Sequence, residues 1–173
     1  MPKNLELKIR CSSFTKIKKS LNEINAEFTG KLIQKDVYYK IAKGLLKLRI
    51  ENGHQSLIKY FRDEKGKDRW SDFQILKFAD SDAEGFLRQI FNIETVVEKK
   101  RLLFMYDNTR IHLDEVKGLG KFLELETKVL FGLPDAKKRF KKIIGLLGLD
   151  FNNQIKKSYK ILIEEKRNDF IKM

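Results

Sequence analysis

Ionisable residues recur two positions apart along several alternating stretches of this chain. These pairs are Lys8/Arg10, Lys47/Arg49, Lys99/Arg101 and Glu124/Glu126. In a β-strand, residues two apart point to the same face of the sheet. Arginine grips phosphate oxygens with paired donors, lysine acts as a point charge, and clustered carboxylates bind Mg²⁺ or Mn²⁺. The residue types therefore predict a site for a polyanion together with a divalent cation.

The stretch 110–126 shows the alternation best. Its two arms alternate charged and apolar residues, and Gly118 and Gly120 separate the arms. This pattern predicts a β-hairpin. The alternative is that the charged faces are the solvent side of a sheet. Lysine and glutamate at variable spacing are typical of a solvent face, whereas this chain repeats Lys/Arg pairs at one fixed spacing on separate strands.

The same periodicity predicts the elements that carry these pairs. Strands are expected at 3–10, 32–41, 45–51, 56–62, 69–78, 94–106 and in the two arms of the hairpin, the second arm ending near 130. Helical spacing of apolar residues predicts helices after Ser12 or Ser13, over 80–91, from Pro134 to Gly148, and over about 153–166. We expect the tail 167–173 to be frayed.

This order of elements predicts an α+β fold, an eight-stranded antiparallel β-barrel or tunnel with flanking helices. Eight strands close into a barrel just wide enough for one small ligand. No linker, repeat or low-complexity tract interrupts the chain, so we expect one domain over 1–173. Charged faces that converge in the lumen would be costly unless a phosphate ligand and a metal ion complete them.

The composition limits the function classes. The 173 residues carry a net charge of +13, with a pI of about 9.7, which favours anionic partners. Cys11 is the single cysteine, and with two histidines in the chain neither a disulfide nor a zinc site is expected. We find no signal segment and no apolar run of about eighteen residues, so we expect a soluble cytoplasmic protein without membrane contact.

Several motifs together resemble the CYTH family, the triphosphate tunnel metalloenzymes. N-L-E-L-K at 4–8 resembles the family signature E-x-E-x-K. The others are Q-K-D-V-Y-Y at 34–39, L-K-L-R-I at 46–50, S-D-F at 71–73, V-E-K-K-R at 97–101, H-L-D-E-V-K-G-L-G-K-F-L-E-L-E at 112–126 and S-Y at 158–159. Their joint order spans nearly the whole chain. The hairpin and the L-K-L-R stretch most resemble the class IV adenylyl cyclase branch.

The resemblance implies a role for each matching residue. The implied triphosphate-binding residues are Lys8, Lys47, Arg49, Lys59, Arg69 and Arg110. The implied catalytic residues are Asp114, Lys99 and Arg101, and the implied ligands of Mg²⁺ or Mn²⁺ are Glu6, Glu124 and Glu126. The implied reaction converts ATP to cAMP and pyrophosphate. Hydrolysis of thiamine triphosphate or inorganic tripolyphosphate is the alternative within the family.

The chain departs from the family signature at Asn4, where the signature has its first glutamate. An amide oxygen coordinates a metal without contributing charge, so we expect weaker metal binding or loss of a second ion. A non-catalytic binder of triphosphates or RNA ends is therefore a second hypothesis. A third is nucleic-acid binding by an outer basic helix, through Lys137, Lys138, Arg139, Lys141 and Lys142. The sequence is compatible with a homodimer as well as with a monomer.

Overall fold

A computed structural model describes residues 3–62, 69–79 and 82–171 of the chain. The elements follow one another as β1 (Lys3–Cys11), α1 (Thr15–Glu23), β2 (Glu27–Tyr39), β3 (Leu45–Glu51), β4 (His54–Arg62), β5 (Arg69–Phe78), α2 (Ala83–Ile90), β6 (Ile93–Tyr106), β7 (Thr109–Val116), β8 (Gly120–Lys128), α3 (Leu133–Leu146), the short 3₁₀ helix η1 (Phe151–Asn153) and α4 (Tyr159–Ile171).

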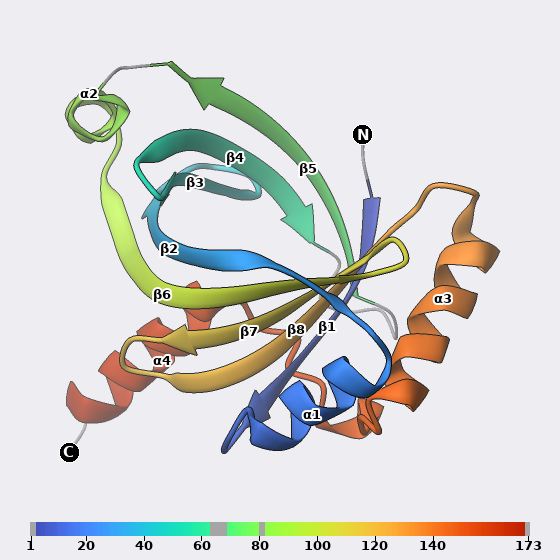
Figure 1. Cartoon of the computed structure of the whole chain (residues 1–173). Coiled ribbons are helices and arrows are strands. Elements are labelled where there is room, and N and C mark those ends of the chain that lie inside the picture. Colours follow the sequence, from blue (N-terminus) through green and yellow to red (C-terminus); the bar gives the residue numbers. More distant parts are fainter. Residues whose placement is uncertain (1–2, 63–68, 80–81, 172–173) are drawn as a thin grey trace.

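The eight strands form a closed antiparallel barrel, which confirms the predicted fold class. Their order around the ring is β1-β5-β4-β3-β2-β6-β7-β8, and β1 closes the ring by pairing with both β5 and β8. Figure 1 shows β2 to β5 as a strongly curved half, and α1, α3 and α4 around the flatter half that contains β7, β8 and β1. Closure pairs every strand on both sides, so every strand can contribute residues to one enclosed interior.

Short turns fix the register of the hairpins. Asn52 and Gly53, with φ of 48° and 88°, connect β3 to β4 in a two-residue turn. Gly118, with a φ of 78°, lies in the turn between β7 and β8, and Gly120, with a φ of 99°, is the first residue of β8. Such positive φ values favour glycine and asparagine. The predicted hairpin is therefore confirmed, and its register places Arg110 opposite Glu126 and His112 opposite Glu124.

The main apolar core lies outside the ring of strands. Alternate residues of β1 and β8, such as Leu7 and Leu125, are fully buried and pack with Leu21 of α1 and with Phe140 and Ile143 of α3. The intervening residues of the same strands face the barrel interior. Alternation thus supplies a hydrophobic face that holds the fold and a polar face that is free for chemistry. None of the described helices combines the length and the apolar character needed to span a membrane.

Strand β2 begins at Glu27, earlier than the predicted residue 32. Its pairing with β6 shifts register between Phe28 and Gly30, and Gly30 has a φ of 154°. A bulge at a glycine lets a strand bend and resume its pairing, so the bend that Gly30 introduces does not end the strand.

Helix α4 begins at Tyr159 and not near 153, and it continues to Ile171 through part of the tail that we predicted to be frayed. The preceding segment is tied to β1, because the Ile155 amide donates to the Lys8 carbonyl at 2.7 Å. Ser158 Oγ then accepts from the Ile161 amide at 3.3 Å, which caps the first turn. The short η1 helix precedes the predicted range apart from Asn153, so the predicted helix starts about six residues too early.

Candidate active site

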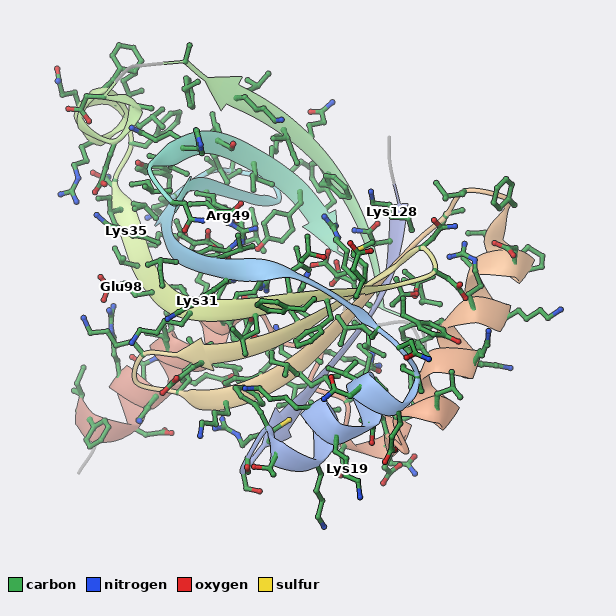
Figure 2. All side chains as sticks on the ribbon, viewed as in Figure 1. Lys19, Lys31, Lys35, Arg49, Glu98 and Lys128 are labelled. Atoms are coloured by element: carbon green, nitrogen blue, oxygen red, sulfur yellow. The ribbon has the colours of Figure 1, made fainter. Side chains whose placement is uncertain are left out.

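The barrel encloses a cavity of about 240 Å³. Alternate residues of all eight strands line it, and Ser158 and Tyr159 are added from the start of α4. Figure 2 shows Arg49 inside the ring of strands, whereas Lys19 and Lys128 lie outside it. The residues two apart that suggested one charged face therefore do converge on a common interior.

One side of the cavity holds three cations around a single buried carboxylate, Asp36 of β2. Asp36 accepts from Lys47 Nζ at 2.8 Å, and from Nε and Nη2 of Arg49, each at 2.8 Å. Lys99 Nζ lies 3.6 Å from Asp36 Oδ2. Among the described residues, Asp36 is the carboxylate within 4 Å of all three, so with both lysines protonated this side carries an excess of positive charge. We name Lys47, Arg49, Lys99 and Asp36 the cation cluster.

The excess charge changes the pKa values within the cation cluster. Burial raises the pKa of Asp36, but Arg49, Lys47 and Lys99 together outweigh it and hold that pKa well below its usual value. Burial lowers the pKa of Lys47, and repulsion from Arg49 adds to the effect, so the pKa is about 7. Burial, followed by the Arg101 charge, also lowers the pKa of Lys99. An anion entering here favours protonation of both lysines.

Strands β1 and β8 carry most of the carboxylates that line the cavity, β7 adds Arg110 and His112, and β8 lies across the ring from β3. Their pairing sets six side chains in two rows, Lys8–Glu124–His112 and Glu6–Glu126–Arg110. Lys8 Nζ is 3.5 Å from Glu124 Oε1, and Arg110 Nη2 donates to Glu126 Oε2 at 2.5 Å. Burial raises the pKa of Glu126, but the charges of Arg110, His112 and Arg101 together outweigh it, and the pKa is about 2.

His112 adds a nitrogen donor to the carboxylates. Its Nδ1 is 3.9 Å from Glu124 Oε2 and 3.8 Å from Glu126 Oε1. Nδ1 is buried and has no hydrogen-bond partner among the described residues. Burial and the Arg101 charge lower the pKa of His112, which favours the neutral ring that binds metals. Ligand atoms each about 2.1 Å from one ion are separated by about 3 to 4 Å, so these three side chains fit a divalent cation.

Arg101 connects the carboxylates to the rest of the cavity. Its Nε and Nη2 donate to the two carboxylate oxygens of Asp114, each at 2.6 Å, and Nη2 also donates to Glu124 at 3.0 Å. Tyr159 donates its hydroxyl to Asp114 Oδ2 at 3.0 Å, and its ring centroid lies 4.0 Å from Lys8 Nζ and 5.1 Å from Lys99 Nζ. Helix α4 thus positions two lysines of the cavity through one aromatic ring.

Most of the predicted site residues line the cavity. They are Glu6, Lys8, Lys47, Arg49, Lys99, Arg101, Arg110, Glu124 and Glu126. The prediction for Lys59 is wrong, because its side chain is exposed, with Nζ 5.7 Å from the Phe61 ring centroid. Ile58 and Tyr60 take the inward positions of β4. A one-residue error in assigning a strand face moves a side chain to the opposite side of the sheet.

Two further predicted residues need separate comment. Asp114 does not line the cavity: it is fully buried behind Arg101, and both of its oxygens accept hydrogen bonds. This placement argues against the catalytic role that the resemblance implied for Asp114, because a general base needs a free oxygen at the reacting group. Arg69 lies opposite Glu6 in the register of β1 and β5, but its side chain is outside the described part of the structure.

Sequence reasoning missed three residues of the site. Asp36 directly precedes the apolar and aromatic residues Val37, Tyr38 and Tyr39. A carboxylate beside such a segment of a predicted strand was the signal that could have identified it. His112 shares the parity of Arg110, so the alternation already placed it on the charged face. Tyr159 belongs to the S-Y motif, but that motif did not assign it a role, and only the tertiary packing of α4 brings it to Asp114.

We expect tripolyphosphate to bind more weakly as the pH rises from about 7 to about 9. The pKa of Lys47 is about 7, so its side chain is protonated at lower pH. At higher pH the free protein holds a neutral Lys47, which must take up a proton when the anion binds. The affinity then falls by at most about tenfold per pH unit. Titration calorimetry in buffers of different ionisation enthalpy measures the proton uptake.

The control is Lys47→Arg, because arginine stays charged throughout this range. The variant should bind with less proton uptake and a flatter dependence on pH. Proton uptake equal to that of the unmodified chain would show that Lys47 is not the titrating group.

The comparisons with known proteins agree with this geometry. The PH1012 protein from Pyrococcus horikoshii OT3 is 27% identical, with a TM-score of 0.77 over 92% of this chain and 98% of its own. A Vibrio parahaemolyticus protein provisionally described as an adenylate cyclase is 19% identical, with a TM-score of 0.72 over 93% and 97%. A Hippeastrum protein described as having a dominant triphosphatase activity is 12% identical, with a TM-score of 0.63 over 94% and 96%.

The last two likenesses, each under 25% identity, show the fold alone. No curated protein matches the chain in sequence. The family model named CYTH domain matches residues 2–159, which is nearly the whole chain. The closed barrel, its charged interior and this match together show that the chain belongs to the CYTH domain family.

Proposed function

We propose that this chain is a metal-dependent enzyme that acts on a triphosphate bound inside the barrel, with the conversion of ATP to cAMP and pyrophosphate as the first candidate reaction. CYTH proteins are generally metal-dependent enzymes that act on triphosphates. The observation that carries the proposal is the separation of charge within one cavity. In the described part of the chain, Lys47, Arg49 and Lys99 share the counter-ion Asp36, whereas Glu124 and Glu126 meet the nitrogen of His112.

In this proposal the cation cluster holds the phosphates. Arg49 offers a planar fork of donors, and Lys47 and Lys99 supply compact positive charges. Asp36 keeps the three cations converged before the substrate enters, because it binds each of them from the adjoining strand. Such preorganisation lowers the cost of binding and fixes the phosphate chain for in-line attack.

The metal fits the side of the cavity formed by β7 and β8. His112, Glu124 and Glu126 would hold it, with Glu6 beside Glu126 as a further carboxylate. Bound there, Mg²⁺ or Mn²⁺ would neutralise charge on the phosphates and on the leaving group. Arg101 and Arg110 balance the carboxylates in the free protein and keep them oriented toward the cavity.

The two candidate reactions differ in the attacking group. In the cyclase reaction the ribose 3′-hydroxyl attacks the α-phosphate and pyrophosphate leaves, whereas in the triphosphatase reaction water attacks the terminal phosphate. The hairpin and the L-K-L-R stretch favour the first. The placement of Asp114 supports the triphosphatase reaction. Asp114 accepts two hydrogen bonds from Arg101 and one from Tyr159, so it is poorly placed to take the proton from a ribose hydroxyl that the cyclase reaction requires.

A non-catalytic triphosphate binder is the candidate from another class. Asn4 is buried at a cavity-lining position and brings no negative charge where the family signature has a glutamate. A binder would retain the cation cluster and the triphosphate affinity but would give no product. Turnover is therefore the observation that separates the two classes.

We expect His112 to make Mn²⁺ bind more tightly than Mg²⁺, because imidazole is a poor ligand for Mg²⁺, which prefers oxygen. His112→Ala should lower the Mn²⁺ affinity by about tenfold and the Mg²⁺ affinity much less. Calorimetry and the electron paramagnetic resonance spectrum of Mn²⁺ measure this without turnover. His54→Ala is the matched control, since His54 is exposed on β4. Equal losses for the two ions would contradict a role for His112 as a ligand.

Incubation of the protein with Mn²⁺ and ATP, and separately with tripolyphosphate, should yield a product that identifies the reaction. Cyclic AMP with pyrophosphate indicates the cyclase, and inorganic phosphate indicates the triphosphatase. Glu126→Gln should lower metal-dependent turnover by about 100-fold, because it removes the carboxylate charge beside His112. Glu115→Gln, an exposed change on β7, is the control. Tight binding of the triphosphate without any product would show that the chain is a non-catalytic triphosphate binder.

Asn4→Glu tests the departure from the family signature. A carboxylate at this buried position should raise the affinity for a divalent ion by severalfold, because it restores a charged oxygen ligand near Glu6. Metal titration of the variant measures the change, and Asn4→Asp and Asn4→Gln bracket side-chain length and charge. An affinity unchanged in Asn4→Glu would show that Asn4 does not occupy a metal position.

A further inference from the structure

Strands β4 and β5 present apolar groups to a cavity that is otherwise largely charged. Among the side chains of these strands that the structure describes, those that line the cavity are Ile58 and Tyr60 of β4 and Phe73 and Ile75 of β5. None of these four side chains carries a charge at neutral pH. We name them the apolar wall. This wall also explains why the prediction for Lys59 was wrong. Ile58 and Tyr60 occupy the inward positions of β4, so Lys59 between them faces outward.

The apolar wall directly adjoins the cation cluster. Lys47 of β3 is the cross-strand partner of Ile58, and Ile58 is the partner of Ile75. Neighbouring strands are about 4.8 Å apart, so the wall begins about 5 Å from Lys47 and extends to about 10 Å. A group attached to a phosphate that contacts Lys47 would reach this wall without leaving the cavity.

Two tyrosines mark the boundary between the charged and apolar parts. The ring centroids of Tyr38 and Tyr60 each lie 5.5 Å from Lys47 Nζ, and their hydroxyl groups are 3.4 Å apart. Their rings therefore provide aromatic surface beside the cation that would meet the phosphate. Aromatic rings stack on flat heterocycles, and such stacking tolerates different bases.

The outer part of the wall is accessible to solvent. Ile75 is 47% exposed although it lines the cavity, and Phe73 is partly buried. Apolar surface facing water in a concave site gains free energy when a ligand covers it. An inorganic polyphosphate has no group that could do so, whereas an organic triphosphate carries one.

We propose that the apolar wall binds the flat organic group of a nucleoside-type triphosphate, so that the protein selects organic triphosphates over inorganic tripolyphosphate. This inference rests on the proposed function, because it requires the phosphates to lie at the cation cluster. It assigns Phe73 and Ile75 to substrate specificity and leaves the holding of phosphate and metal to the charged residues.

The test compares two ligands that share the phosphate chain, α,β-methylene ATP and tripolyphosphate, by calorimetry on the full chain. The unmodified chain should bind the ATP analogue more tightly. The double variant Phe73→Ser/Ile75→Ser should lose about tenfold in affinity for the analogue and less than about twofold for tripolyphosphate. Leu76→Ser is the matched control, since Leu76 is 65% exposed on the same strand and does not line the cavity.

The outcomes separate the two proposals. If the unmodified chain binds neither ligand, the proposed function fails. If it binds tripolyphosphate and the double variant keeps full affinity for the ATP analogue, or loses affinity for both ligands equally, only the apolar wall is rejected. If the double variant does not fold, the single variant Ile75→Thr takes its place in the test. Threonine keeps the β-branched shape and has a hydroxyl group where isoleucine has its ethyl group. A loss confined to the ATP analogue would again support the wall, and no selective loss would overturn it.

Discussion

The structure depends on the pairing of opposite charges inside a closed barrel. Asp36 holds three cations, and Arg101 binds Asp114 with two hydrogen bonds at 2.6 Å. Removing one member of such a buried pair leaves an uncompensated charge, at a cost of about 3 to 5 kcal/mol. The strand order brings these partners together, since each pair joins neighbouring strands. The barrel topology is therefore an electrostatic requirement as well as a hydrophobic one.

The interior is divided into three zones that correspond to three parts of a substrate complex. Cations of β3 and β6 gather around Asp36 of β2, and carboxylates and His112 lie on β7, β8 and β1. Among the described side chains, β4 and β5 contribute apolar groups. A lumen of uniform positive charge would attract any polyanion. This division instead allows recognition of a phosphate chain by its charge and of the attached group by its shape.

Much of the fold followed from period-two alternation, because each strand has one buried and one charged face. The hairpin after Thr109 and the inward positions of Lys47, Arg49 and Glu124 could all be inferred from spacing. The face of β4 could not, since Ile58, Lys59 and Tyr60 are compatible with either orientation. The start of α4 could not either, because it is set by a hydrogen bond from Ile155 to the Lys8 carbonyl, far away in the sequence.

The site was predicted less completely than the fold, for a physical reason. Spacing reports which face a residue shares but not how far it lies along the barrel axis or what it pairs with. Asp114 has the correct parity, yet Arg101 and Tyr159 enclose it. His112 has the same parity and reaches the carboxylates because Glu124 is its direct cross-strand partner. Register decided their roles, and register follows from the turns.

Strand β8 illustrates how such a scaffold accommodates change. Its Leu123 and Leu125 are packed in the outer core, whereas Glu124 and Glu126 belong to the cavity. Because successive residues serve opposite sides of one sheet, substitutions that retune the interior leave the packing of the helices in place. Within this nine-residue strand, the positions that set the chemistry of the cavity are therefore distinct from the positions that hold the fold. The same fold can evolve different activities without any change to its outer core.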